Sequence, residues 1–307
     1  MANSYIKAAS IVQAAVLLLE RDIVLPRLVW TQPEANFYGA LDDTITLRVP
    51  AVLTTTNRAM RSDDQLVAQT LTETSVPVKL DRHIYSLLNI RDEELTLDIR
   101  DFAAQVLSRQ MRAVAEGAET VIASAITGAT WEADPVDFAE GTDKGYDVLI
   151  KAGRELNKLN VPRSERVFLC GANVEAALFA DDRVVKANEA ATDSALREAT
   201  IARLAGFTVV GSNAIDPDDA YAFHRTAIAF ANVAPALPEG AAMKARTATE
   251  SFALRYLRDY DPTASNGPVD RTLVDAFVGA VSIEDGATAS VESNKRGVEI
   301  DFTPEGS

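Results

Sequence analysis

The sequence is poor in the residues that build covalent cross-links and metal sites, because its 307 residues include one cysteine and two histidines. A single cysteine excludes a disulfide framework within the chain, and Cys170, in the apolar run RVFLCG, is typical of a small buried hydrophobe. His83 and His224 lie far apart and neither has metal-ligand spacing. We therefore expect no metal site and a structural role for both histidines.

Long hydrophobic runs are also missing. The run AAVLLL near the N-terminus is too short to cross a bilayer and is followed at once by Glu20, Arg21 and Asp22. The first residues, MANSYIKAAS, lack the basic region and long apolar segment of a secretory signal. We expect a soluble protein made in the cytosol.

Catalytic motifs are absent as well. The sequence contains no H-E-x-x-H, C-x-x-C, G-x-S-x-G, phosphate-binding or dinucleotide-binding motif. Carboxylate pairs such as Asp42-Asp43 and Asp181-Asp182 are expected by chance in a chain with 45 acidic residues. We therefore assign no catalytic residue, no cofactor-binding residue and no metal ligand, and we expect no cofactor.

The charge is strongly of one sign, with a formal net charge of −15. A protein that coats a nucleic-acid duplex or binds an anionic membrane needs a basic surface, so both classes are disfavoured. Such a charge also opposes self-association. If the protein assembles, the attraction must come from matched local patches.

The longest helical pattern runs from Asp98 to Thr127 and predicts a rod of roughly 45 Å. Asp98 is placed to cap its start, and Gly128 to form a left-handed cap at its end. Charged residues, including Arg109 and Arg112, share the opposite face. The apolar face contains Ile99, Phe102, Ala103, Val106, Leu107, Val114, Ala118, Val121, Ile122, Ala125 and Ile126.

A long hairpin is predicted before this helix. Residues 42–54 and 70–80 alternate apolar and polar side chains, as strands do, and a polar segment with mixed charges separates them. A two-stranded hairpin is barely stable alone in water, so this one should lie on another surface. The preceding segment has a helical pattern and then aromatic residues without a core period, which is typical of an arm.

The rest of the chain is mixed. Helical patterns occupy 146–160 and a short stretch after 170, and strand patterns occupy 166–170, 206–215, 221–233, 247–260 and 269–283. The polar segment from Glu284 onward looks like an appendage. No βαβ rhythm appears, so the chain is predicted to be α+β.

Three pairs of stretches carry a family resemblance when taken in order. They are TETSVPVKLD with IRDEELTLDIRDFAAQVLSRQM, RVFLCGANVEAALF with LREATIARLAGFTVVGSNAI, and ALRYLRDYDP with VDRTLVDAFVGAVSI. Over residues 1–283 the chain resembles the major capsid proteins of tailed phages, and the coat proteins of short-tailed phages are the closest branch.

The resemblance implies the Hong-Kong-type capsid fold, which tailed phages share with herpesviruses. The implied parts are an N-terminal arm (1–38), an extended hairpin loop (39–82), a peripheral domain with the spine helix (83–130), an axial domain (131–245), return strands of the peripheral domain (246–283) and a C-terminal extension (284–307). The hairpin is then expected to lie on a neighbouring subunit.

The implied function is structural and not enzymatic: self-assembly into an icosahedral head that encloses the phage genome. The implied partners are further copies of the chain in hexamers and pentamers, a scaffolding protein, a portal and decoration proteins. Genomic DNA would be enclosed without sequence-specific binding and without a membrane. The implied location is the virion, with assembly in the host bacterial cytoplasm.

The candidate intersubunit contacts come from the hairpin, the spine helix and the arm. They are Arg58, Arg61, Asp63, Asp64, Lys79, Arg109, Arg112 and Trp30. Some relatives cross-link a hairpin lysine to an asparagine of another subunit. Lys79 lies at the hairpin base, so we do not expect that cross-link here.

Two alternatives stay open. A cellular encapsulating shell of the same fold would contain an enzyme cargo in place of DNA. An α+β enzyme that uses a carboxylate pair would be a monomer that a ligand stabilises.

Overall fold

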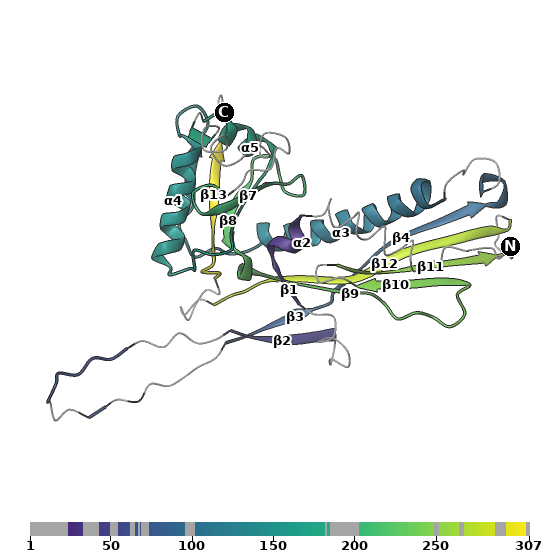
Figure 1. Ribbon diagram of the computed structural model, residues 1–307, viewed down its shortest axis with the longest axis horizontal. Coiled ribbons are helices and arrows are strands. Elements are labelled where there is room, and N and C mark those ends of the chain that lie inside the picture. The colour runs from purple at the N-terminus through teal and green to yellow at the C-terminus, as the bar shows by residue number, and fades with distance from the viewer. Residues whose placement is uncertain are drawn as a thin grey trace, which may run out of the picture.

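The computed structural model contains two sheets at an angle to each other and a projecting hairpin (Figure 1). It describes residues 24–32, 43–49, 55–61, 65–66, 68, 74–95, 102–181, 183–184, 203–248, 252–263, 267–285 and 293–304. The α+β prediction is confirmed.

The first sheet, called the long sheet, has six strands. They are β1 (Trp30–Gln32), β9 (Ile228–Val233), β12 (Val269–Ser282), β11 (Ala253–Asp261), β10 (Met243–Ala248) and β4 (Arg82–Arg91). The central strand β12 pairs antiparallel with β4, β11 and β9, so most of the sheet is held by this one segment.

Helix α3 (Ser108–Thr127) lies along one face of the long sheet, after a π-helical turn at Ala103–Leu107. Its apolar side is buried against β12 and β4, as the helical pattern predicts. The side chain of Gln110 is also buried, where it donates to the carbonyls of Ser86 and Thr272 at 3.1 and 3.0 Å. The predicted cap Asp98 lies outside the described residues.

Two glycines of α3 and its C-terminal end differ from what the sequence pattern indicates. A Cβ on Gly117 would lie 2.8 Å from Cγ2 of Ile84, so this glycine lets α3 approach β4 closely. Gly128 is not in the predicted left-handed conformation, because its φ is −85°. Its N–H instead continues the helical pattern by donating to the carbonyl of Ser124 at 3.0 Å.

The second sheet, called the upright sheet, has five strands. They are β5 (Val136–Ala139), β13 (Gly297–Thr303), β8 (Ala220–His224), β6 (Arg166–Cys170) and β7 (Phe207–Gly211). One face packs against α4 (Gly145–Lys158) and α5 (Ala172–Phe179). On the other face, Val167, Leu169 and Phe223 join the core beneath α3, so one apolar core connects the two sheets.

The polar C-terminal segment is not the predicted appendage. β13 lies inside the upright sheet, between β5 and β8. The physical reason is its alternation: Val298, Ile300 and Phe302 enter the core beneath α4, while Glu299 and Asp301 face outward.

The pattern over 221–233 also divides differently from the prediction. β8 belongs to the upright sheet and β9 to the long sheet, with a short 3-10 turn at Arg225–Ala227 between them. Strands β9 and β10 therefore take part of the predicted axial segment 131–245 into the long sheet.

The hairpin strands β2 (Thr44–Val49) and β3 (Thr74–Lys79) pair antiparallel in a sheet of their own. Leu47, Val76 and Val78 pack against β9 of the long sheet. At the hairpin root, a Cβ on Gly279 of β12 would lie 1.8 Å from the carbonyl oxygen of Lys79, so only glycine allows this crossing. Residues 55–61 lie far from both sheets (Figure 1).

We predict that Ala113→Pro disrupts the fold. Ala113 is exposed in the middle of α3, so the substitution removes no core contact and acts through the backbone. Proline inside a helix costs about 3 kcal/mol or more. The expected result is insoluble protein or a collapsed midpoint in urea denaturation, whereas Ala113→Gln should behave like the wild type. Wild-type stability of the proline variant would contradict the packing assigned to α3.

Candidate assembly surfaces and the junction between the sheets

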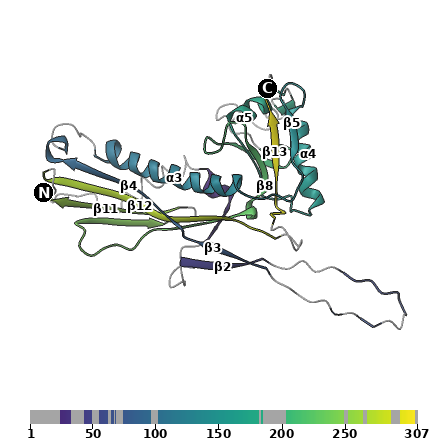
Figure 2. The same ribbon diagram turned by 180° about the vertical axis from the view of Figure 1, so that it is seen from behind.

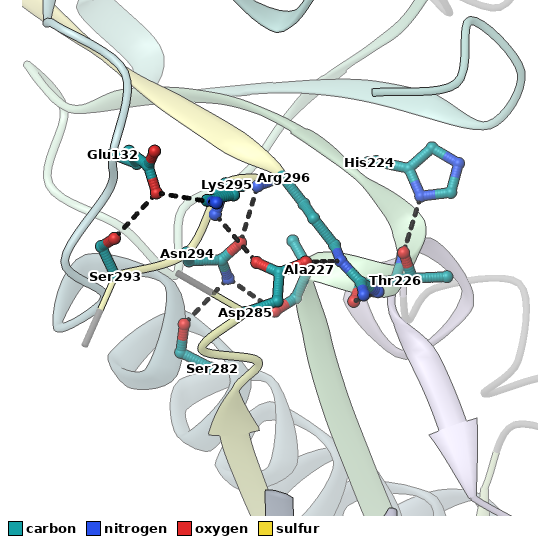
Figure 3. A network of polar contacts seen from close by, with 10 residues as sticks. All are labelled: Glu132, His224, Thr226, Ala227, Ser282, Asp285, Ser293, Asn294, Lys295 and Arg296. Atoms are coloured by element: carbon teal, nitrogen blue, oxygen red, sulfur yellow. Dashed lines mark hydrogen bonds and ion pairs between the residues drawn. The ribbon is translucent and has the colours of Figure 1, made fainter. Parts of the chain in front are cut away.

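The junction between the two sheets is a network of polar contacts built from segments distant in sequence (Figure 3). It joins the end of β12, the residues just before β13, the turn between β8 and β9, and Glu132, which follows the end of α3. Asn294 lies at its centre and is fully buried. Its side-chain amide donates to the carbonyl of Ala227 at 2.8 Å and to Oγ of Ser282 at 2.9 Å.

The backbone of Asn294 also forms hydrogen bonds across the junction. Its N–H donates to the carbonyl of Thr130 at 2.8 Å, and its carbonyl accepts from the N–H of Glu132 at 3.0 Å. The end of α3 is thereby connected to the start of β13. The indole ring of Trp131 stacks on Phe223, with centroids 6.5 Å apart, and packs against the apolar core beneath α3.

An ion pair closes the network. Nε of Arg296 donates to Oδ2 of Asp285 at 2.7 Å, and its Nη1 donates to the carbonyl of Thr226 at 3.1 Å. Nδ1 of the buried His224 lies 2.8 Å from Oγ1 of Thr226. Burial lowers the pKa of His224, which favours the neutral ring in this position. The junction thus holds the two sheets in one relative orientation.

The predicted contact residues do not form a single site. Arg58 and Arg61 are exposed at the hairpin tip, beside an almost fully exposed Met60, while Asp63 and Asp64 lie outside the described residues. Arg109 and Arg112 are exposed on α3, and Nε of Arg112 donates to Glu116 at 2.8 Å.

The other two predicted residues lie near the hairpin base. Lys79 is exposed at the end of β3. Trp30 in β1 is half-buried and packs with the apolar cluster where the hairpin meets the long sheet. Whether any of these residues contacts another subunit stays a prediction.

A contact that sequence reasoning missed anchors the N-terminal segment. Oε1 of Glu119 on α3 accepts the N–H groups of Val24 and Leu25 at 2.8 and 3.3 Å, at the start of α2 (Leu25–Leu28). The partners are 95 and 94 positions apart, so no local pattern identifies them. A polar pocket beside this contact lies between α3 and residues 211–214.

The upright sheet exposes an acidic face. Asp137, Glu299 and Asp301 point away from α4, and Asp219 lies near Glu299. None of these carboxylates forms an ion pair with another described residue. Burial raises the pKa of Glu299, and the charges of Asp219 and Asp301 raise it further. Burial likewise raises the pKa of Asp219.

The described residues contain no group of acidic, histidine and cysteine side chains that could hold a metal ion. Burial raises the pKa of Cys170 to about 12, so its thiol is a poor nucleophile. No helix in this part of the chain has the length and apolar character needed to span a bilayer.

Comparison with known proteins shows similarity in structure alone. No protein-family model and no curated protein matches the sequence. The capsid structure of Cyanophage P-SCSP1u is 11% identical, with 99% of this chain and 91% of that chain covered and a TM-score of 0.65. A chain of Mycobacterium phage Che8 is 19% identical, with coverage of 92% and 91% and a TM-score of 0.60.

The chain has the fold of tailed-phage capsid proteins. A virus-like particle from Pyrococcus furiosus is also similar, with 11% identity, coverage of 94% of this chain and 96% of that chain, and a TM-score of 0.50. The capsid fold therefore extends over nearly the whole chain, and the predicted Hong-Kong-type fold is confirmed. The short-tailed-phage branch stays a prediction.

We predict that Asn294→Ala weakens the junction. The substitution removes both side-chain hydrogen bonds and leaves buried polar groups without partners, at a cost of about 2 kcal/mol or more. The measurement is the free energy of unfolding in urea. Asn213→Ala is the control, because Asn213 is exposed. Equal stability of the two variants would contradict the role of Asn294.

We also predict a pH effect at the acidic face. The folded-state pKa of Glu299 is raised, so the folded chain binds a proton more readily than the unfolded chain, and stability falls as pH rises above the ordinary glutamate value of 4.5. Glu299→Gln removes this loss. It should raise the melting temperature at pH 7 but leave it nearly unchanged at pH 3.5. The exposed Glu239→Gln should change neither; a uniform gain at both pH values would refute the argument.

Proposed function

We propose that this chain is a major capsid protein that assembles into the icosahedral head enclosing a phage genome. The observation that carries the proposal is the capsid fold itself, which covers 99% of the chain in one comparison. The proposed assembly units are hexamers and pentamers, formed with a scaffolding protein and a portal and completed by decoration proteins.

The projecting hairpin supports a role in assembly. Its base is held by the long sheet, but residues 55–61 extend away from both sheets. Met60 is 93% exposed and Leu66 is 84% exposed, which is costly for apolar side chains in water. A neighbouring copy would cover them and would pair with Arg58 and Arg61.

The rigid junction supports the same role. A shell needs each subunit to hold its contact surfaces at a reproducible angle, and the Asn294 network holds the two sheets in this way. The acidic composition fits an enclosure that confines DNA without binding it, because like charges repel.

The similarity to a virus-like particle from Pyrococcus furiosus supports a second candidate function with the same fold, that of a cellular encapsulating shell. Negative-stain microscopy of the expressed protein tests both. Closed shells support either shell function, whereas monomers that a ligand stabilises would favour the enzyme alternative. Shells isolated from infected cells with packaged DNA would identify a phage head, and shells with an enzyme cargo would identify the alternative.

We predict that Arg58→Glu combined with Arg61→Glu impairs assembly without unfolding the chain. Both side chains are exposed at the tip, so the reversal changes no described core contact. The expected result is soluble, folded protein that forms few shells by microscopy and sedimentation. Arg58→Lys combined with Arg61→Lys preserves the charge and should assemble. Normal shells from the reversed variant would contradict the role of the hairpin tip.

A further inference from the structure

A basic depression lies between α4, the segment before β6 and the turn before β7 on a chain of acidic net charge. The described residues that line it include four cations and no carboxylate. They are Leu149, Ile150, Gly153, Arg154, Asn157, Lys158, Arg163, Arg166, Ala205 and Gly206. We call this surface the α4 groove. Ile150 within it is 51% exposed, so the groove offers apolar contact as well as charge.

The positive charge of the groove is only partly balanced within the chain. The buried carboxylate of Glu155 on α4 accepts hydrogen bonds from Nε of Arg154 at 3.0 Å and from Nζ of Lys158 at 2.6 Å. The buried Arg166 donates to neutral acceptors, including the carbonyls of Pro162 and Val161 at 2.8 and 2.7 Å. One carboxylate therefore faces four cations, and the surplus is positive.

The acidic face of the upright sheet lies on the opposite side of the same unit. Val298, Ile300 and Phe302 of β13 point toward α4, so Glu299 and Asp301 must point the other way. Asp137 is paired in register with Asp301 and faces the same side. In both views α4 lies on one side of the upright sheet and α3 extends from the other (Figure 1, Figure 2).

We propose that the α4 groove binds the acidic face of a second copy of this chain. The charges are complementary, and the contact would relieve the repulsion among Asp219, Glu299 and Asp301. Two different patches on opposite sides make a head-to-tail contact, which produces a ring when the rotation closes. This proposal rests on the proposed shell function, because rings of this kind would be its building units.

The test is a charge swap. Arg154→Glu with Arg163→Glu reverses the groove, and Asp137→Lys with Glu299→Lys and Asp301→Lys reverses the face. Each set alone should reduce assembled protein about tenfold or more, because the attraction between the two patches is then lost. The five substitutions together restore opposite charges between the groove and the face and should restore assembly. Arg183→Glu, an exposed cation outside the groove, is the control, and circular dichroism verifies folding.

A second measurement does not depend on shell formation. Copies labelled with ¹⁴N and ¹⁵N are mixed at low salt and treated with a carbodiimide, which joins an amine to a carboxylate. Peptides that join Lys158 of one label to Glu299, Asp301 or Asp137 of the other support the contact. Wild-type shells that lack such peptides, formed equally well by the reversed variants, would overturn the inference while leaving the proposed function intact.

The remaining outcomes are also decisive. Cross-linked rings without shells would support the contact and contradict the proposed shell. Neither shells nor cross-links would contradict both. If reversing the groove leaves assembly unchanged but reduces retention of DNA, the occupant is a polyanion and the proposed contact between copies is wrong.

Discussion

The buried amide of Asn294 is the interaction on which the arrangement of the molecule depends. Each sheet has its own hydrogen-bonded ladder, and the junction joins the two sheets through polar contacts with specific directions. Asn294 connects the turn before β9, the end of β12 and the end of α3 at one point. Because an unpaired amide in this position would carry the full cost of desolvation, alternative angles are strongly disfavoured. The apolar core that extends from α3 to Val167 and Leu169 stabilises the packing of one sheet against the other. The amide of Asn294 favours one specific angle between them.

This division of roles explains how a projecting hairpin can be tolerated. The crossing of Lys79 over Gly279 fixes the root of the hairpin against β12, which is also the central strand of the long sheet. Leu47, Val76 and Val78 then cover β9. The hairpin base is therefore part of the folded core. Contacts within the same chain determine the direction in which the hairpin, with the exposed Met60, projects. An assembly contact made in this way depends on the stability of the subunit that presents it.

Local periodicity predicted many of the elements but not their partners, and it missed the strands β1, β5 and β10. The amphipathic pattern predicted α3, and the alternation around 42–54 and 70–80 predicted β2 and β3, because these signals depend on residues close in sequence. The sheet to which a strand belongs is decided by distant contacts, so the division of β8 from β9 and the place of β13 were missed. Glu119 and Asn294 were missed for the same reason. The predicted tip residues Arg58 and Arg61 were found by charge in a turn, a signal that reveals exposure but not the identity of a partner.

The acidic charge places a constraint on any assembly of this chain. At −15, two copies repel at long range, so attraction must be concentrated where cations gather and must act within a Debye length. Such cations are gathered in the α4 groove, and the carboxylates with raised pKa lie on the reverse of the same sheet. The repulsion that destabilises the isolated acidic face would then favour association, since contact with a basic surface removes it. The same charges would also make association weaker at high salt, which allows the contact to be reversible until the shell closes.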